Sequence, residues 1–190
     1  MKLKKYLELI IYYILPVILL ILTATLNNKN LFAKFGQIAL ITVVLILFLK
    51  PVAKISNIKK LKYLLIYRRQ FGIASFWFFA FHAFGMWQRI KGYADLDLYL
   101  NPKVNILYGL IAAVGMIILT ITSNDFAIKK LKTNWKRIQY IAYPVLFLAL
   151  YHAALAEDEI SRFYIISGLF ILLKILEWSK IGLKKRIEEK

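Results

Sequence analysis

The chain alternates between long apolar runs and short segments rich in lysine and arginine. A helix that crosses a bilayer needs about 20 mainly apolar residues. Six stretches meet or approach that length: residues 6–26, 31–49, 70–88, 104–122, 138–156 and 161–179. The pattern predicts an all-α protein in which residues 1–190 form a single domain, a polytopic bundle of six transmembrane helices.

Composition supports a membrane protein and excludes several chemistries. Hydrophobic residues make up 61% of the chain, whereas soluble domains contain about 45–50%. Cysteine is absent, which excludes disulfides, iron–sulfur ligation by cysteine and thiolate catalysis. The sequence also has no glycine-rich phosphate loop and no stretch long enough for a nucleotide-binding or flavin-binding domain.

The formal charge of +17 raises the question of nucleic acid, but its distribution indicates topology instead. Twenty of the 27 basic residues lie in the N-terminus, in segments 50–69 and 123–137, and in the C-terminal tail. The opposite loops, near 27–30, 89–103 and 157–162, hold five basic residues and several carboxylates. By the positive-inside rule both termini are cytoplasmic, and the expected partner is the lipid bilayer rather than nucleic acid.

Both histidines of the chain, His82 and His152, lie inside apolar runs. His82 is about twelve residues into the third span and His152 about fourteen into the fifth, or roughly 18 and 21 Å of helix rise. Both spans run outward in the predicted topology, so the imidazoles lie within about one helical turn of the same depth. Ionisable residues inside a membrane are costly to bury and mark functional sites.

Two facing imidazoles at one level are the axial ligand set of a b-type haem, which would lie between their helices. Ser75 and Gly85 keep the helix surface beside His82 narrow. Small residues are equally common where transmembrane helices merely pack closely. From the residues alone, the pair is therefore either a haem site or a pair of polar packing contacts.

Other chemistries fit the chain less well. A zinc site needs three or four ligands, and the chain offers two histidines and no cysteine. A proton relay would need carboxylates in the core, whereas Glu8 and Glu177 lie near the cytoplasmic ends of their spans. The alternative to a cytochrome is a small cofactor-free transporter, channel or assembly factor.

Two stretches, within about residues 64 to 155, resemble the ferric reductase-like transmembrane domain family. The first is Arg68-Arg69-Gln70-Phe71-Gly72 with the aromatic-rich helix up to His82. The second is Thr122-Ser123-Asn124 followed by Trp135-Lys136-Arg137-Ile138, Tyr143 and His152. Within that family the chain most resembles the haem-binding MsrQ (YedZ) subunits of the bacterial methionine sulfoxide reductase system, which implies a multi-pass protein of the bacterial inner membrane.

The resemblance implies a b-type cytochrome in which His82 and His152 are the axial ligands of haem iron. Many relatives hold a further histidine thirteen residues before the ligand on the fifth helix. Here that position is Gln139, and Arg69 stands thirteen residues before His82. Carboxamide and guanidinium groups are poor iron ligands, so one haem b is expected, on the outer side.

The resemblance also implies redox partners and a second set of binding residues. Quinol or reduced flavin would donate electrons, with FMN or a quinone as a further cofactor, and a periplasmic reductase subunit or ferric iron would accept them. The residues expected to hold a flavin phosphate or haem propionate by charge-assisted hydrogen bonds are Arg68, Arg69, Lys136 and Arg137. The competing interpretation is that these residues only fix topology and contact anionic lipid.

Overall fold

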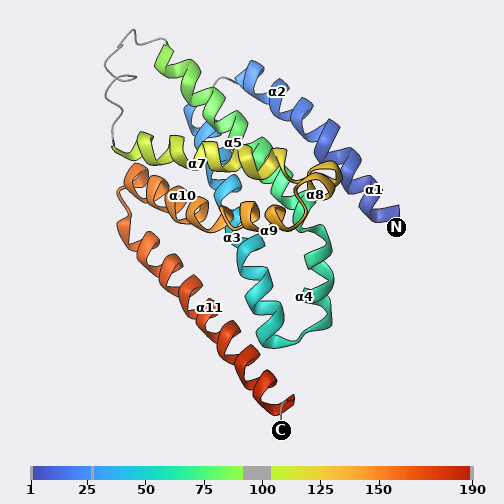
Figure 1. Ribbon diagram of the computed structural model, residues 1–190. Helices are drawn as coiled ribbons and strands as arrows, with labels where there is room; N and C mark the ends of the chain where they lie inside the picture. The colour runs from blue at the N-terminus through green and yellow to red at the C-terminus, as the bar shows by residue number, and fades with distance from the viewer. Residues whose placement is uncertain (1, 27, 92–103, 189–190) are drawn as a thin grey trace.

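The computed structural model describes residues 2–26, 28–91 and 104–188, which form helices joined by short turns, with no strand among them (Figure 1). The elements are α1 (Lys2–Leu9), the π-helix η1 (Ile10–Ile14), α2 (Leu15–Leu26), α3 (Lys29–Ser56), α4 (Lys59–Leu64), the 3-10 turn η2 (Leu65–Tyr67), α5 (Arg68–Lys91), α7 (Val104–Ile121), α8 (Asp125–Leu131), α9 (Thr133–Gln139), α10 (Ala142–Glu157) and α11 (Ile160–Glu188). The all-α prediction is confirmed for these residues. Most of the predicted outer loop 89–103 lies outside them.

The first predicted span is a continuous helix with a π-helical segment in its middle. The N–H of Leu15 bonds to the carbonyl of Ile10, five residues back, instead of four. Pro16 follows directly, and a proline has no N–H and clashes with the carbonyl four residues before it. The π-helical turn therefore places the irregularity just before the proline, and α1, η1 and α2 continue in one direction (Figure 1).

The second predicted span is longer in the structure than in the sequence pattern. The side chain of Asn28 caps α3 by accepting from the N–H of Asn30 at 2.8 Å. The helix ends at Ser56 and is followed by Asn57, whose φ of 59° is left-handed, so α3 continues seven residues past the predicted end at position 49. Pro51 lies inside this extension and is buried.

Within the described residues, three helical segments are long and apolar enough to cross a membrane, namely Lys4–Leu26, Lys29–Ser56 and Thr133–Glu157. A fourth is possible if Ile106–Ile121 and Asp125–Leu131, which meet at a bend of 91°, count as one broken span. Large apolar side chains such as Val114 (59% exposed) and Ile165 (67% exposed) cover the outside of the bundle. These features are those of an integral membrane protein.

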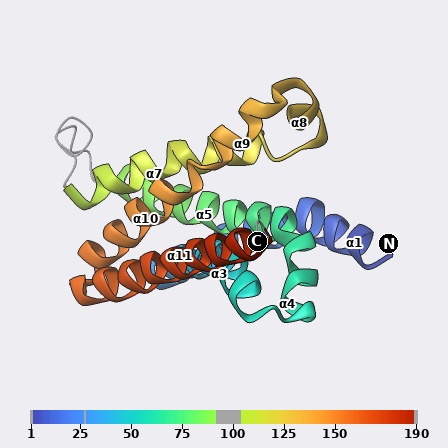
Figure 2. The ribbon, with the colours of Figure 1, turned by 60° about the horizontal axis from the view of Figure 1, so that its bottom comes forward.

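The interior contains two apolar clusters. One joins α2, α3 and α5 around Leu19, Phe32 and Phe35. The other joins α3, α10 and α11 around Leu47, Leu146 and Phe170. Helix α11 packs along α3 and α10, while α8 and α9 project from the far side of the bundle (Figure 2). Helix α3 is common to both clusters and is the central helix.

An ion-pair group links α3 to α11 away from the histidines. The carboxylate of Glu177, only 2% exposed, contacts Lys54 Nζ at 2.9 Å and Lys174 Nζ at 2.7 Å. Glu177 was expected near the cytoplasmic end of its span, and both of its partners are basic. Because both carboxylate oxygens are paired, the group fixes the two helices in register rather than leaving an isolated buried charge.

We expect Glu177→Ala to lower the free energy of unfolding by about 2 kcal/mol, because Lys174, whose side chain is 19% exposed, loses its charge-assisted hydrogen bond to the carboxylate. The matched control is Glu159→Ala, which removes a carboxylate from an exposed pair with Arg162 and should cost less than about 1 kcal/mol. Reversible unfolding of the detergent-solubilised protein measures both values. Equal losses in the two variants would contradict this account of Glu177.

Candidate functional site

The two histidines lie on different helices and their rings are neighbours. His82 is on α5 and His152 on α10, and their ring centroids are 6.4 Å apart with an interplanar angle of 67°. Both side chains are half-buried. The similar depths estimated from the sequence thus correspond to rings that lie close together in space.

The hydrogen bond of His82 fixes which nitrogen is available for other chemistry. Its Nδ1 lies 2.8 Å from the carbonyl oxygen of Phe32 on α3. A carbonyl only accepts, so Nδ1 must carry the proton, and the lone pair of the neutral ring is then on Nε2. Histidines that bind metals commonly donate their other N–H to a backbone carbonyl in this way.

The spacing of the rings suits one metal ion held by both. Two metal–imidazole bonds of about 2.0 Å, with about 1.2 Å from each ring centre to its nitrogen, give roughly 6.4 Å between ring centres. Among the described residues, no group of three or more His, Cys, Asp or Glu side chains could hold a metal ion. Two imidazole nitrogens are the number of protein ligands that a bis-histidine haem uses.

The two small residues predicted to lie on the face of His82, Ser75 and Gly85, contact α3, which His82 also contacts. Ser75 is fully buried, and its hydroxyl donates to the carbonyl of Ala39 at 2.9 Å. Gly85 lies against the ring of Phe32, so closely that a Cβ atom there would overlap it. Both residues bring α5 close to α3, and so hold His82 at the distance that its bond to Phe32 requires.

The positions thirteen residues before each histidine meet at one turn. Arg69 donates from Nε to the carbonyl of Ser123 at 2.6 Å and from Nη1 to Asp125 at 2.8 Å. Gln139 donates from Nε2 to the hydroxyl of Thr122 at 3.0 Å. Arg69 and Gln139 therefore tie α5 and α9 to the turn between α7 and α8.

The four basic residues predicted as one binding group are in different environments. Arg69 is engaged by the turn, while Lys136 and Arg137 are exposed on α9. Arg68 is half-buried, and its Nε has no hydrogen-bond partner among the described residues. Of the four, Arg68 is the one whose donor is both buried and available.

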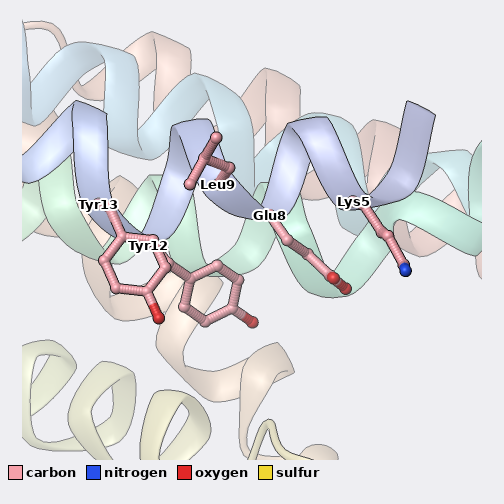
Figure 3. Close-up of a pocket in the computed structure, with 5 residues that line it drawn as sticks. All are labelled: Lys5, Glu8, Leu9, Tyr12 and Tyr13. Atoms are coloured by element: carbon pink, nitrogen blue, oxygen red, sulfur yellow. The ribbon is translucent and has the colours of Figure 1, made fainter. Parts of the chain in front are cut away.

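A shallow groove of about 390 Å³ runs along α1 and η1 (Figure 3). Its lining residues are Lys5, Glu8, Leu9, Tyr12 and Tyr13. Glu8 accepts a hydrogen bond from Gln70 Nε2 at 3.0 Å. Sequence reasoning assigned nothing to this surface, because a polar helix end near a membrane boundary is ordinary.

Sequence reasoning also missed the glycines that contact the histidine rings. Gly36 on α3 lies against His82, and Gly109 on α7 lies against His152. The available signal was a glycine inside an otherwise apolar span. Many transmembrane helices share that feature, so it could not identify a contact between two particular residues.

The fold and this site define a class: an integral membrane helical bundle with an imidazole pair between two of its helices. Residues 35–150 match the family described as ferric reductase like transmembrane component. The match covers more than half of the chain and includes His82, while His152 lies just beyond its end. The chain belongs to the ferric reductase-like transmembrane family.

One relative is the magnetosome protein MamZ of Magnetospirillum gryphiswaldense, which is 31% identical over 129 residues. The alignment covers 65% of this chain and 19% of MamZ, so the chain spans only a small part of that relative's length. No solved structure matches the chain.

Arg69 should lower the pKa of Asp125, because the guanidinium donates a hydrogen bond to the carboxylate and attracts its charge. A carboxyl group whose pKa is depressed in the folded protein stabilises the fold above its ordinary pKa, and that contribution is lost as pH falls through the lowered value. We expect the pKa of Asp125 to lie below its ordinary value of 3.8 and to rise in Arg69→Gln. A carbon-13 NMR titration of the carboxyl group measures it.

Lys136→Gln is the control for this titration, because it removes a positive charge from the neighbouring α9 without touching Asp125. Its Asp125 pKa should match that of the wild type. An Asp125 pKa that stays the same in Arg69→Gln would contradict the contact.

Proposed function

We propose that the protein is a membrane b-type cytochrome in which His82 and His152 bind the iron of one haem b. The observation that carries the proposal is the pair of rings 6.4 Å apart on two helices, together with the bond that leaves Nε2 of His82 able to coordinate. Membership of the ferric reductase-like family, whose members generally bind haem, supports it.

The proposal is one haem rather than two. In two-haem relatives a second histidine pair would be expected about thirteen residues, or roughly 20 Å of helix, toward the cytoplasm. Arg69 and Gln139 occupy those positions and are engaged by the turn at residues 122–125. Neither side chain is a good iron ligand, so this end of the bundle contributes structure instead.

When bound, haem b would supply one-electron exchange between a donor and an acceptor. The chain's own residues would bind and orient it: the imidazoles of His82 and His152 would hold the iron, and the apolar cluster around Phe32 and Phe35, on the helix that His82 contacts, would limit access of water. We propose a quinol or a reduced flavin as the donor, from the cytoplasmic side or the membrane, and an acceptor on the outer face.

Two further assignments belong to the same proposal. An MsrQ-like protein would deliver electrons to a periplasmic reductase subunit, and a broader ferric reductase-like role would deliver them to iron. A flavin phosphate or a haem propionate would be held by the basic residues Arg68, Arg69, Lys136 and Arg137. Arg68 is the favoured member, because a buried Nε without a partner gains most from an anion.

We also propose six membrane spans in a bacterial plasma membrane, with both termini in the cytoplasm. Helices occur at all six positions, and the distribution of basic residues favours this orientation. Helices α5 and α11 would be the more polar spans, α5 through His82 and its polar ends, and α11 through Lys174 and Glu177.

We expect the purified wild-type chain, expressed with adequate haem, to contain one haem b with a b-type α band in its reduced-minus-oxidised spectrum. His82→Ala and His152→Ala should each lose the low-spin signal of two imidazole ligands. Gln139→Ala is the control and should keep one haem per chain, because it alters the inner position only. A wild-type protein without pigment would contradict the proposal and favour a cofactor-free transporter, channel or assembly factor.

The topology predicts which turns face the cytoplasm. Green fluorescent protein fused after Asn57 or Lys132 should be fluorescent, and alkaline phosphatase fused after Asp158 should be active, because the two reporters work on opposite sides of a bacterial plasma membrane. Exchanging the reporters at the same three positions is the control and should abolish both signals. Alkaline phosphatase activity at Asn57 would exclude this orientation.

A further inference from the structure

We infer that Gly36 and Gly109 are positioning residues for the two imidazoles, each letting a histidine ring dock on the backbone of the neighbouring helix. The inference rests on the proposed haem site and deepens it, since it concerns how the ligands are oriented. It assigns a role to α3 and α7, which carry neither histidine.

At the first histidine, Gly36 leaves room that any side chain would fill. A Cβ atom on Gly36 would lie 2.8 Å from Nδ1, 2.9 Å from Cε1 and 3.1 Å from Cγ of His82. Contacts this short do not occur between ordinary atoms, so an alanine would displace the ring. The ring is held by its hydrogen bond and cannot swing aside as the end of a long flexible chain would.

The bare backbone at Gly36 also explains how His82 reaches its hydrogen-bond acceptor. Phe32 precedes Gly36 by one helical turn on α3, so its carbonyl oxygen points along the helix toward residue 36. The ring lies against the glycine and bonds that oxygen at 2.8 Å. Without the close approach that glycine allows, Nδ1 could not bond to a carbonyl that also belongs to the helix.

At the second histidine the same three ring atoms meet the other glycine in the same order. A Cβ atom on Gly109 would lie 2.9 Å from Nδ1, 3.0 Å from Cε1 and 3.3 Å from Cγ of His152. The main-chain carbonyl one turn before Gly109 on α7 is that of residue 105. At the first histidine the acceptor is the carbonyl one turn before the glycine. By the same relation, we assign the carbonyl of residue 105 as the acceptor for Nδ1 of His152.

The contact with histidine is specific to these two positions among the glycines that the structure characterises. Gly72 and Gly168 have no atom within 4 Å of an added Cβ, and Gly85 and Gly115 meet the apolar side chains Phe32 and Val145. Close helix packing therefore accounts for Gly85 and Gly115. It does not account for two imidazoles presenting Nδ1 to two glycines in the same way.

The consequence concerns the orientation and the basicity of the ligands. A backbone carbonyl that accepts the Nδ1 proton fixes the tautomer with the lone pair on Nε2 and makes the imidazole a stronger donor to iron. Losing this bond should weaken binding of haem about 10-fold to 100-fold, as for other second-shell contacts of metal ligands. Because a stronger donor favours ferric iron, its loss should also raise the midpoint potential.

The first test measures the tautomers in the wild-type chain without haem. With only two histidines in the sequence, nitrogen-15 NMR of histidine-labelled protein in lipid nanodiscs shows each ring separately. The inference expects a protonated Nδ1 and an unprotonated Nε2 at both. A proton on Nε2 at either ring would overturn it, and this result does not depend on whether any variant folds.

The second test compares Gly36→Ala and Gly109→Ala with matched glycine variants after loading with haem b. Both variants should bind haem more weakly, and ferric haem should lose more affinity than ferrous haem. The midpoint potential should then rise by 59 mV for each factor of ten by which the ferric loss exceeds the ferrous loss. Gly72→Ala and Gly168→Ala should match the wild type. Gly115→Ala should lower stability through Val145 and leave the potential unchanged.

These outcomes separate the inference from the function on which it rests. Wild-type protein that binds no haem would overturn the proposed function. Wild-type protein that binds haem, with an unchanged potential and affinity in Gly36→Ala and Gly109→Ala, would overturn the positioning role alone. A potential shift of equal size in Gly115→Ala would also overturn it, by showing that helix packing in general sets the potential.

Discussion

The arrangement depends on one requirement: an imidazole inside an apolar bundle must find an acceptor for its N–H. An unpaired polar group buried in such surroundings costs about 1–3 kcal/mol. His82 meets the requirement through the carbonyl of Phe32. The acceptor is main chain on a different helix, so α5 must approach α3 closely, and the small residues at the crossing, Gly36 and Gly85, permit it. The hydrogen bond thereby determines both the local helix packing and the nitrogen that the ring presents.

The bundle can be understood as two helix hairpins, each of which places a histidine ring of one helix against a glycine of the other. In the first, residue pairs 36 with 82 and 39 with 75 lie opposite each other, so α3 and α5 are antiparallel. In the second, residues 109 and 152 are opposite, as are 115 and 145, so α7 and α10 are antiparallel too. Each hairpin has one helix with a histidine and one with a glycine. The two rings meet where the hairpins meet, 6.4 Å apart, and α3 also carries the packing that joins the hairpins to α2 and α11.

Much of this architecture could be predicted from the sequence, and the reasons for the rest are physical. Apolar runs with the length of a bilayer locate helices, because every backbone group in a span must bond within its own segment. The rise per residue of a helix gives the depth of each residue within its span. Counting residues from the start of each span therefore predicted that His82 and His152 lie at similar depths. Rotation about a helix axis and the choice of neighbours depend on side-chain packing, which periodicity does not specify when the helix is apolar all round. For this reason the sequence placed Ser75 and Gly85 beside His82 but not against α3, and gave no role to Gly36 or Gly109.

The asymmetry between the two ends of the bundle has a physical consequence for the proposed cytochrome. At one end the hairpins meet through imidazoles, which can bind a cofactor. At the other end Arg69 of the first hairpin donates to the turn at residues 122–125 of the second, and Gln139 ties α9 to the same turn within the second hairpin. If this inner position held neither a cofactor nor polar side chains, the carbonyl of Ser123 and the hydroxyl of Thr122 would lose these partners. Polar side chains there keep the α7–α8 turn attached to α5 and α9, and so preserve the relative position of the hairpins on which the distance between the imidazoles depends. The contacts of Arg69 and Gln139 at one end of the bundle therefore support the geometry of the imidazole pair at the other end.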